Sequence, residues 1–519
     1  MPVSSSAGPG GPAGPSGSAG GIRAGTGAGR WILVATVLGS GMAMLDSTVV
    51  NVALPTIGKS FDTSLASLQW TVNAYTLTLA GLILLGGALG DRYGRRRVFV
   101  IGVVWFALAS LLCGVAPNVE VLIAARALQG VGGALLTPGS LAIIQASFHP
   151  DDRARAVGAW SGLGGVASAL GPFLGGWLVD AVSWRWVFLI NLPLAVVTVV
   201  VALRTVPETF DPQPRGRFDV SGAALAALAL AGITWALVEV EANPVAAGIA
   251  GAVGVAAGIG FVAIERRTRE PMLPLDIFRV RLFSSVNVVT LFVYGALGAF
   301  MLLFVLELQT VAGYSAQKAG LSLVPVTIVM LLLSARSGDL ARRIGPRWQL
   351  SIGPVVCASG LLLLLRVGPG SAYVTHVLPG VLVFGLGLAS LVAPLTATVL
   401  ASVDVTRAGI ASGVNNAAAR AAGLLTVAGL PALVGLSGDG YRDPGAVDTG
   451  FHRALWICAG LMLVGTAVAW FTIPSTAFAA EEGTAPAVPC GRTGCDVAGP
   501  PLDPGDVAVD TTAGEGRAG

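Results

Sequence analysis

Long, unbroken apolar segments recur along most of the chain. Each runs for about 20 residues, the length of helix that crosses about 30 Å of hydrocarbon at about 1.5 Å per residue. Strands of a membrane barrel would instead alternate in polarity over about ten residues. The pattern predicts fourteen transmembrane helices, at residues 31–53, 68–90, 97–116, 120–145, 154–180, 184–204, 219–240, 244–264, 283–311, 317–336, 348–367, 374–400, 407–436 and 453–473.

Composition supports lipid as the solvent for most of the chain. Of the 519 residues, 54% are hydrophobic and 11% are charged, against roughly 25% charged in an ordinary soluble domain. Because only helices or closed barrels satisfy the backbone in lipid, the sequence predicts an all-α integral membrane protein. The Gly-, Ser-, Pro- and Ala-rich segment 1–29 and the polar segment 475–519 are expected to be disordered tails.

Arginine and lysine divide unevenly between alternate connections. Nineteen follow even-numbered spans and six lie in or beside the connections after odd-numbered spans. Since positive residues concentrate on the cytoplasmic side, both termini are expected in the cytoplasm.

A short repeat divides the chain into halves. The segment 87–96 matches residues 338–347 at five positions, each 251 residues apart, and the copies follow the second and tenth spans. This spacing predicts two six-helix halves, 30–204 and 283–474, with two inserted helices within 205–282. Halves of this kind are typical of secondary transporters.

Two charged side chains of the first half, Asp46 and Arg126, lie well inside predicted spans. A charge at mid-membrane costs roughly 2.5–3.5 kcal/mol on insertion scales, so each needs a function or a partner. Asp46 in the first span is a candidate for proton or substrate handling, and Arg126 in the fourth is a candidate to clamp an acid such as Asp46. The alternatives are a polar contact between helices for Asp46 and an arginine that reaches the membrane surface for Arg126.

Glycines mark two further motifs. The first motif follows the second span and places an acid and arginines among glycines. It is a candidate cytoplasmic gate, with topological anchoring of the chain as the alternative. Its residues are Gly87, Asp91, Arg92, Gly94 and Arg95. In the fifth span, Pro172 removes a helix hydrogen bond, and Gly171, Gly175 and Gly176 permit close helix contact. This second motif has a simple packing face as its alternative.

With the segments 45–55 and 126–132, these motifs resemble those of the major facilitator superfamily, and within it the fourteen-helix drug:proton antiporters, over about residues 31–474. The resemblance implies a monomer in the bacterial inner membrane that exchanges protons for an amphipathic small molecule by alternating access. It also implies proton coupling or substrate binding at Asp46 and Arg126, and antiport for the fifth-span motif. The second copy of the loop motif departs from the family form, with Arg342 where the first has Asp91.

Other polar and aromatic residues carry weaker signals. Glu307, near the outer end of the ninth span, is either a second titratable group for coupling or an interfacial acid. Six residues are candidates to line a substrate cavity, although helix packing also explains the aromatic ones: Asn51, Tyr75, Gln129, Tyr294, Gln309 and Asn416. Arg420 and Asn415 add polar groups to the thirteenth span.

These features predict an exporter of drug-like or antibiotic molecules driven by protons. A dedicated exporter of one metabolite on the same fold is the main alternative. A membrane enzyme is disfavoured because the chain has three histidines and no metalloprotease or nucleophile-elbow motif. A channel or sensor would work without a proton gradient. The pair Cys490 and Cys495 is a poor zinc pattern without a nearby histidine, and no cofactor, metal or nucleic-acid partner is expected.

Overall fold

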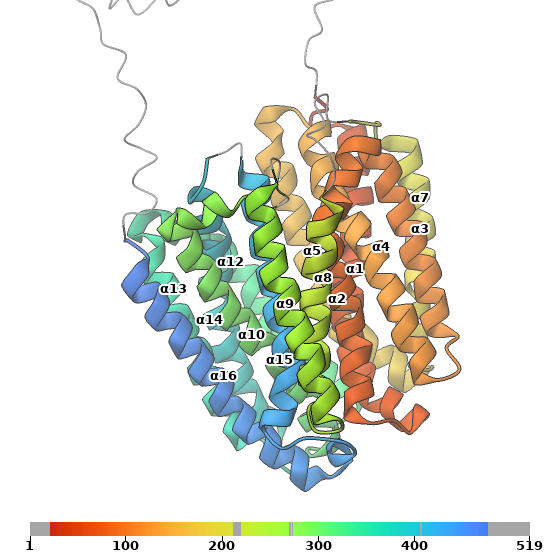
Figure 1. The fold of residues 1–519 in the computed structure, drawn as a ribbon, viewed down its shortest axis with the longest axis vertical. Helices are drawn as coiled ribbons and strands as arrows, with labels where there is room; N and C mark the ends of the chain where they lie inside the picture. Colours follow the sequence, from red (N-terminus) through yellow and green to blue (C-terminus); the bar gives the residue numbers. More distant parts are fainter. Residues whose placement is uncertain (1–20, 211–218, 269–270, 272, 405–406, 476–519) are drawn as a thin grey trace, which may run out of the picture. The chain divides into compact units, whose positions relative to one another are not determined.

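The computed structural model describes residues 21–210, 219–268, 271, 273–404 and 407–475, which form helices joined by short connections (Figure 1). The long helices are α1 (Gly27–Phe61), α2 (Leu65–Tyr93), α3 (Arg95–Gly114), α4 (Val119–Ser147), α5 (Pro150–Ala181), α7 (Asn191–Thr205), α8 (Val220–Glu239), α9 (Pro244–Arg267), α10 (Arg281–Thr310), α12 (Val324–Ile344), α13 (Pro346–Leu363), α14 (Leu378–Ala401), α15 (Ala408–Leu433) and α16 (Pro444–Thr472). Short helices α6 (Trp186–Leu189), α11 (Ala316–Ser322) and η1 (Leu275–Arg279) lie between them.

The expected fourteen-helix architecture is present. In the described residues, thirteen helical segments are long and apolar enough to cross a membrane, and the remaining expected span is α15, whose middle carries Arg420. Two spans are interrupted, α6–α7 and α11–α12. Pro193 and Pro325 lie just after these breaks and lack the N–H that would bond back to the preceding turn.

The first helix begins earlier than the sequence pattern predicts. Thr26 caps α1 by accepting a hydrogen bond from the Gly29 amide. Before it, the Ile22 amide bonds to the Ser147 carbonyl at 2.9 Å, and the Ala24 amide bonds to the Asp152 carboxylate at 3.0 Å. The segment 21–29, expected as part of a tail, therefore packs on the end of α4 and the start of α5. The tail from residue 476 onward lies outside the described residues.

The two halves repeat one packing plan. In the first, α4 packs on α2 and α3, and α1 packs on α5 and α7; in the second, α14 packs on α12 and α13, and α10 packs on α15 and α16. The loop motifs also match, because Gly94 and Gly345 each join two helices with positive φ angles of 108° and 83°. Such angles favour glycine, which has no Cβ to clash.

The inserted helices α8 and α9 pack on each other, and α8 also contacts α2 and α15. They lie in front of the line where the two halves meet (Figure 1). Asp219 begins α8 by accepting a hydrogen bond from the Gly222 amide at 2.7 Å. The inserted pair thus covers one side of the contact between the halves.

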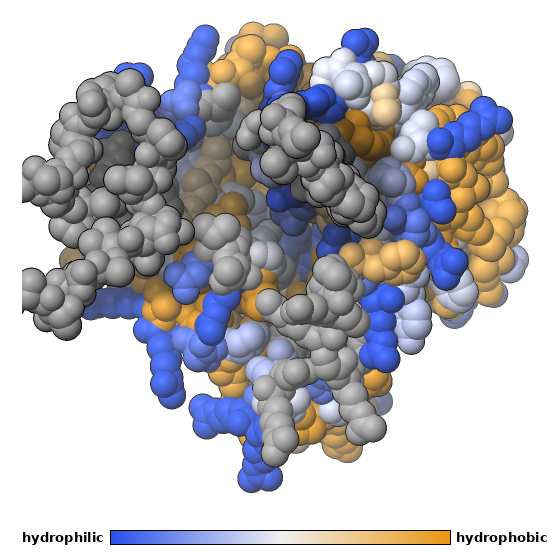
Figure 2. All heavy atoms as spheres, turned by 90° about the horizontal axis from the view of Figure 1, so that it is seen from above, coloured by the Kyte–Doolittle hydropathy of each residue, from blue (hydrophilic) through white to orange (hydrophobic). Residues whose placement is uncertain are grey.

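The connections after even-numbered spans gather at one end of the bundle, which we call the arginine-rich end. Figure 2 looks onto this end, where hydrophilic side chains gather around the face. The connections after odd-numbered spans lie at the other end, called here the opposite end. The two ends differ in how the halves meet.

Polar contacts join the halves at the opposite end. The Tyr441 hydroxyl donates to the Thr63 carbonyl at 2.6 Å, and Arg442 Nη1 lies 2.6 Å from the Asp62 carboxylate. Gln69 Nε2 donates to the Val427 carbonyl at 2.7 Å. All three contacts connect residues of α1 or α2, or the turn between them, to α15 or the connection after it.

The face of α5 that points to the second half shows that the halves separate toward the arginine-rich end. Near the opposite end, the Pro172 carbonyl and Gly176 lie against α11. The two helices are so close there that a Cβ added to a glycine at this contact would force the backbone to shift. About two, three and four turns back from Pro172, a Cβ at Gly165, Gly162 or Gly158 would meet nothing within 4 Å. On this side the halves are therefore closed at the opposite end and apart at the arginine-rich end.

Candidate functional site: a buried charge network

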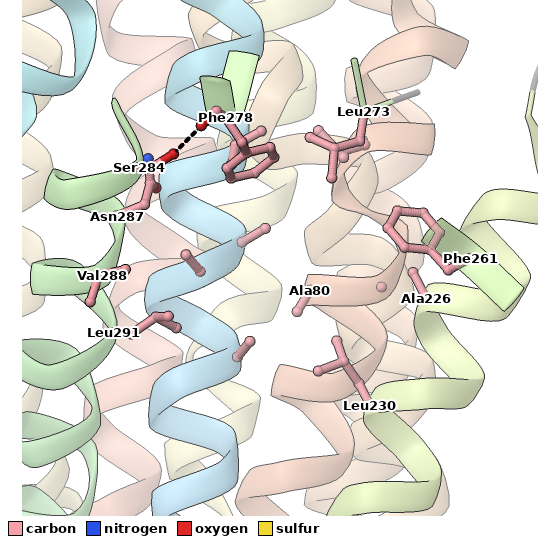
Figure 3. Close-up of a pocket in the computed structure, with 16 residues that line it drawn as sticks. Ala80, Ala226, Leu230, Phe261, Leu273, Phe278, Ser284, Asn287, Val288 and Leu291 are labelled. Carbon is pink, nitrogen blue, oxygen red and sulfur yellow. Dashed lines mark hydrogen bonds between the residues drawn. The ribbon is translucent and has the colours of Figure 1, made fainter. Parts of the chain in front are cut away.

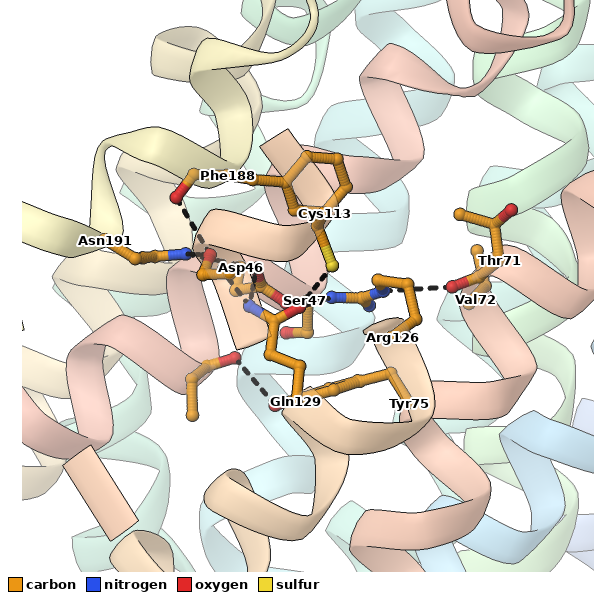
Figure 4. Close-up of polar contacts among 12 residues, drawn as sticks. Asp46, Ser47, Thr71, Val72, Tyr75, Cys113, Arg126, Gln129, Phe188 and Asn191 are labelled. Carbon is orange, nitrogen blue, oxygen red and sulfur yellow. Dashed lines mark hydrogen bonds and ion pairs between the residues drawn. The ribbon is translucent and has the colours of Figure 1, made fainter. Parts of the chain in front are cut away.

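The two intramembrane charges of the first half form a direct ion pair. Asp46 of α1 and Arg126 of α4 are both buried, and Arg126 Nη1 lies 2.5 Å from Asp46 Oδ2. The pair expected from the sequence is therefore present, 80 residues apart in the chain. Figure 4 shows Asp46 and Arg126 with Gln129 and Asn191 around them.

Two amide side chains complete the coordination of Asp46. Gln129 Nε2 donates to Asp46 Oδ1 at 2.8 Å, and Asn191 Nδ2 donates to the same oxygen at 3.2 Å. Both amides also donate to the Ser110 hydroxyl, at 3.1 and 3.0 Å. Asp46 is thus held by groups from α4 and α7, so its position does not depend on Arg126 alone.

Arg126 is bound on each side of its guanidinium. Its Nε donates to the Thr71 carbonyl at 3.0 Å, and its Nη1 also donates to Gln129 Oε1 at 2.7 Å. The guanidinium carbon stands 4.3 Å from the centre of the Tyr75 ring, a cation–π contact. Since Tyr75 belongs to α2, the charge of Arg126 links α2 to α1 and α4.

A buried ion pair is stable only when its charges lie close together and form further hydrogen bonds. Two charges removed from water lose several kcal/mol of solvation each, and only close pairing with additional hydrogen bonds offsets the loss. Removing one partner leaves the other uncompensated. Any event that neutralises Asp46, including protonation, therefore weakens the main interaction that holds Arg126.

The loop motif of the first half is anchored within that half. Arg95 Nε donates to Asp91 Oδ1 at 2.8 Å. The Arg96 amide donates to Glu208 Oε1 at 3.0 Å, so the connection after α7 holds the start of α3. Gly94 provides the turn and Gly87 faces Pro138 of α4, while the Arg92 guanidinium carbon lies 5.9 Å from the centre of the Tyr93 ring.

The glycine–proline motif of α5 lies against both halves. A Cβ at Gly175 would stand 2.8 Å from Val49 Cγ1 of α1, and Gly171 is even closer to Thr48. Pro172 and Gly176 face α11 of the second half. The motif therefore allows α5 to contact α1 and α11 closely at the place where the halves meet.

The structure divides the cavity candidates among several places. Tyr75 and Gln129 join the charge network. Gln309 Nε2 donates to the Val52 carbonyl at 2.9 Å, a contact between α10 and α1. Asn51 bonds to the Ser47 carbonyl of its own helix at 3.2 Å. Tyr294 and Asn416 lie in the second half, near Arg420.

Glu307 is separate from the charge network. It is buried in α10, and neither of its carboxylate oxygens accepts a hydrogen bond from a described residue. It interacts with Asp448 of α16, whose Oδ1 in turn lies 3.6 Å from His452 Nδ1. The second half therefore contains a carboxyl pair of its own.

An apolar pocket of about 360 Å³ lies beside the inserted helices. Ala226 and Leu230 of α8 and Phe261 of α9 line it together with Leu291 of α10, as Figure 3 shows. Of the residues singled out in the sequence, none is among its lining residues. The pocket is thus distinct from the charge network.

Sequence reasoning missed Ser110, Asn191 and Asp448 as partners of the candidate acids. Asn191 is a polar residue inside an apolar span and could have been noticed for that reason. Ser110 is an ordinary residue of an apolar helix, and nothing in its sequence context distinguishes it. Asp448 lies close to the end of a span, where charged residues are common.

Comparison with known proteins identifies the family of the chain. A family model described as Major Facilitator Superfamily matches residues 36–427. The chain is 34% identical over 480 residues to a puromycin resistance protein of Streptomyces alboniger, covering 88% of this chain and 94% of that protein. It is 36% identical over 392 residues to the multidrug resistance protein Stp of Mycobacterium tuberculosis, covering 74% of this chain and 72% of that protein.

A crystal structure of a bacterial homolog of the human lysosomal transporter Spinster, in an inward-facing and unoccupied conformation, has a similar fold. It superimposes with a TM-score of 0.60 at 17% sequence identity and covers 88% of this chain and 98% of its own. From the family match, the relatives and the two-halved helical fold, we conclude that the chain belongs to the Major Facilitator Superfamily of membrane transporters.

Proposed function

We propose that this protein exports drug-like or antibiotic small molecules in exchange for protons by alternating access. The observation that carries the proposal is the buried Asp46–Arg126 pair, held in one half of a bundle whose halves meet at one end and separate toward the other on the α5 side. The names of the two relatives, a puromycin resistance protein and a multidrug resistance protein, support export as the direction.

The coupling chemistry follows from the pair. With Asp46 ionised, Arg126 is bound and the α1–α4 contact is tight. A proton on Asp46 removes the charge that attracts Arg126, and the amides of Gln129 and Asn191 then hold a neutral acid. We propose that substrate and proton bind in alternation because each favours a different position of Arg126.

Alternating access requires that the two ends open in turn. By the positive-inside rule we propose that the arginine-rich end and both termini lie in the cytoplasm of a plasma-membrane protein. The separation of the halves at that end on the α5 side supports an inward-facing state. The Asp62–Arg442 and Thr63–Tyr441 contacts would break in the outward-facing state. The loop motif around Asp91 would close the arginine-rich end.

Proton entry supplies enough free energy for export. One proton that moves inward through about 150 mV releases about 3.5 kcal/mol, which sustains a gradient of about 300-fold for a neutral solute. We propose Glu307, with Asp448 near it, as a second proton-holding position, because a buried carboxylate without a hydrogen-bond donor is costly to keep charged. The protein is proposed to work as a monomer.

The test uses everted membrane vesicles with an acidified lumen and a fluorescent reporter of the pH gradient. A transported compound should release lumenal protons when it is added to vesicles that contain the wild-type protein. Asp46→Asn, which keeps the size of the side chain, should abolish the release for every compound in an antibiotic panel. The matched control is Glu241→Gln, an exposed acid between α8 and α9, which should behave as wild type.

Two outcomes would contradict the proposal: no compound in the panel dissipates the gradient with wild-type protein, or Asp46→Asn dissipates it at the wild-type rate. The same panel decides the second candidate function, a dedicated exporter of one antibiotic. The naming of one relative for resistance to a single compound, puromycin, favours that candidate. Proton release with only one chemical class would indicate a dedicated exporter.

A further inference from the structure

Arg420 lies in the middle of α15 without an acidic partner. Its Nε donates to Asn416 Oδ1 at 2.9 Å, and no carboxylate of the described residues forms an ion pair with it. It stands 12 residues from the start of the helix at Ala408, or about 18 Å at about 1.5 Å per residue. Its side chain is therefore too short to reach either membrane surface.

The face of α15 that carries Arg420 points toward the first half. A second face of this helix, with Val414 and Ala418, lines the apolar pocket beside the inserted helices, and a third carries Thr426, which bonds to the Gly295 carbonyl of α10. Arg420 and Asn416 lie four residues apart on the remaining face. Asn416 is exposed and Arg420 is half-buried, so this face is not filled by neighbouring side chains.

Two tyrosines lie within electrostatic reach of Arg420, Tyr294 in α10 and Tyr75 in α2. The Tyr75 hydroxyl is also within electrostatic reach of Asp46 and Arg126. Tyr75 is therefore within electrostatic reach of both a paired arginine and an unpaired one.

The charges around Tyr75 do not balance. Asp46 contributes one negative charge and Arg126 one positive charge, and these two are paired at 2.5 Å. Arg420 adds a second positive charge with only an amide oxygen to accept its hydrogen bond. Since arginine does not lose its proton in proteins, the region keeps a net charge of one positive.

From this imbalance we propose that Arg420 binds an anionic group of the transported compound. The guanidinium fork suits a carboxylate or an ionised phenol, and the half-buried ring of Tyr294 provides a face for an aromatic skeleton. The substrate class is an aromatic acid or acidic phenol. The inference rests on the proposed export function and names the chemistry of its cargo.

The test compares two dyes that share a xanthene ring but differ in charge, fluorescein as the anion and rhodamine 123 as the cation. Binding to the purified full-length protein is measured in detergent by fluorescence anisotropy. The wild type should bind fluorescein at least about tenfold more tightly than rhodamine 123, because a charge-assisted hydrogen bond contributes about 1.5–3 kcal/mol.

Variants at position 420 isolate the charge. Arg420→Gln should weaken fluorescein binding about tenfold or more and leave rhodamine 123 binding unchanged or tighter. Arg420→Lys keeps the positive charge but loses the planar guanidinium. Its affinity for fluorescein should therefore lie between that of the wild type and that of Arg420→Gln. An unfolding temperature equal to that of the wild type shows that each variant is folded.

Wild-type preference for rhodamine 123, or unchanged fluorescein binding by folded Arg420→Gln, would overturn the assignment. If Arg420→Gln does not fold, the substitute experiment measures whether benzoate displaces fluorescein from the wild-type protein. Displacement by neutral benzamide but not by benzoate would overturn the proposal. Anion binding that depends on Arg420, together with no proton release from vesicles, would support this inference while rejecting the proposed function.

Discussion

The first half holds its intramembrane charges as a closed network, whereas the second half leaves Arg420 and Glu307 without partners of opposite charge in the described residues. Asp46 has Arg126 and two amides around it. Arg420 has one amide oxygen, and Glu307 faces another acid. Because the halves share one packing plan, the difference lies in side chains and not in backbone.

The comparison suggests a division of labour between the halves. A paired charge responds to a proton by releasing its partner, which suits coupling. An unpaired charge at an open helix face takes its partner from outside the protein, which suits cargo binding. The following changes test that division, from the largest expected effect to the smallest.

The largest difference is expected between leucine substitutions at the two arginines. Arg126→Leu leaves Asp46 buried and unpaired, so it should lower the free energy of unfolding by roughly 3–5 kcal/mol. Arg420→Leu removes an uncompensated charge and should leave stability unchanged or raise it. Thermal unfolding in detergent measures both.

A double variant sharpens this result. Asp46→Leu combined with Arg126→Leu should lose less stability than the two single changes together, because the second change removes the charge exposed by the first. Equal losses for Arg126→Leu and Arg420→Leu would mean that both arginines are paired to the same extent, and the contrast between the halves would not hold.

A smaller change, a gain in stability, is expected at the acid pair of the second half, Glu307 and Asp448. Glu307→Gln replaces one carboxyl by an amide that can donate to Asp448, so stability at neutral pH should rise by about 1 kcal/mol. Glu241→Gln, at an exposed acid, serves as the control without change. A loss of stability in Glu307→Gln would show that an ionised Glu307 is favourably bound.

The smallest effect concerns the contact that closes the opposite end. The Tyr441 hydroxyl and the Asp62 carboxylate raise the pKa of Arg442. A raised pKa means that the contact is fully formed below the ordinary arginine pKa and is lost only as pH rises above it, so it persists through the neutral range. Arg442→Ala should modestly raise the fraction of molecules in which the opposite end is open.

An impermeant maleimide applied from the opposite end measures that shift. A cysteine introduced by Asn51→Cys should react about twofold faster in the Arg442→Ala background, in line with the small energy of exposed ion pairs. The control is Arg366→Ala, at an exposed arginine of the same end. Slower labelling after Arg442→Ala would contradict a role in closure.

The helical plan could be predicted from the sequence because the bilayer imposes a length on each span. The pairing of Asp46 with Arg126 also followed, since two charges inside apolar helices need each other. Their amide partners did not follow. Asn191 reaches Asp46 across 145 residues, and that contact depends on the rotation of α7 about its axis, which an apolar pattern on all sides does not specify.

The helix ends and the tail were less predictable. The segment 21–29 looks like the polar tail before it, yet Ile22 forms backbone hydrogen bonds with the end of α4. The position of Glu307 shows the same difficulty, because its neighbour Asp448 lies on a helix 141 residues later. Contacts of this kind depend on tertiary packing and leave little trace in local sequence.

The most direct test is a count of protons released when cargo binds to purified protein in a weakly buffered detergent solution. Exchange at Asp46 predicts that a saturating transported compound releases protons from wild-type molecules that carry a proton on Asp46, and none from Asp46→Asn. Release of the same amount from folded Asp46→Asn would contradict the central claim that this carboxyl exchanges a proton for the cargo.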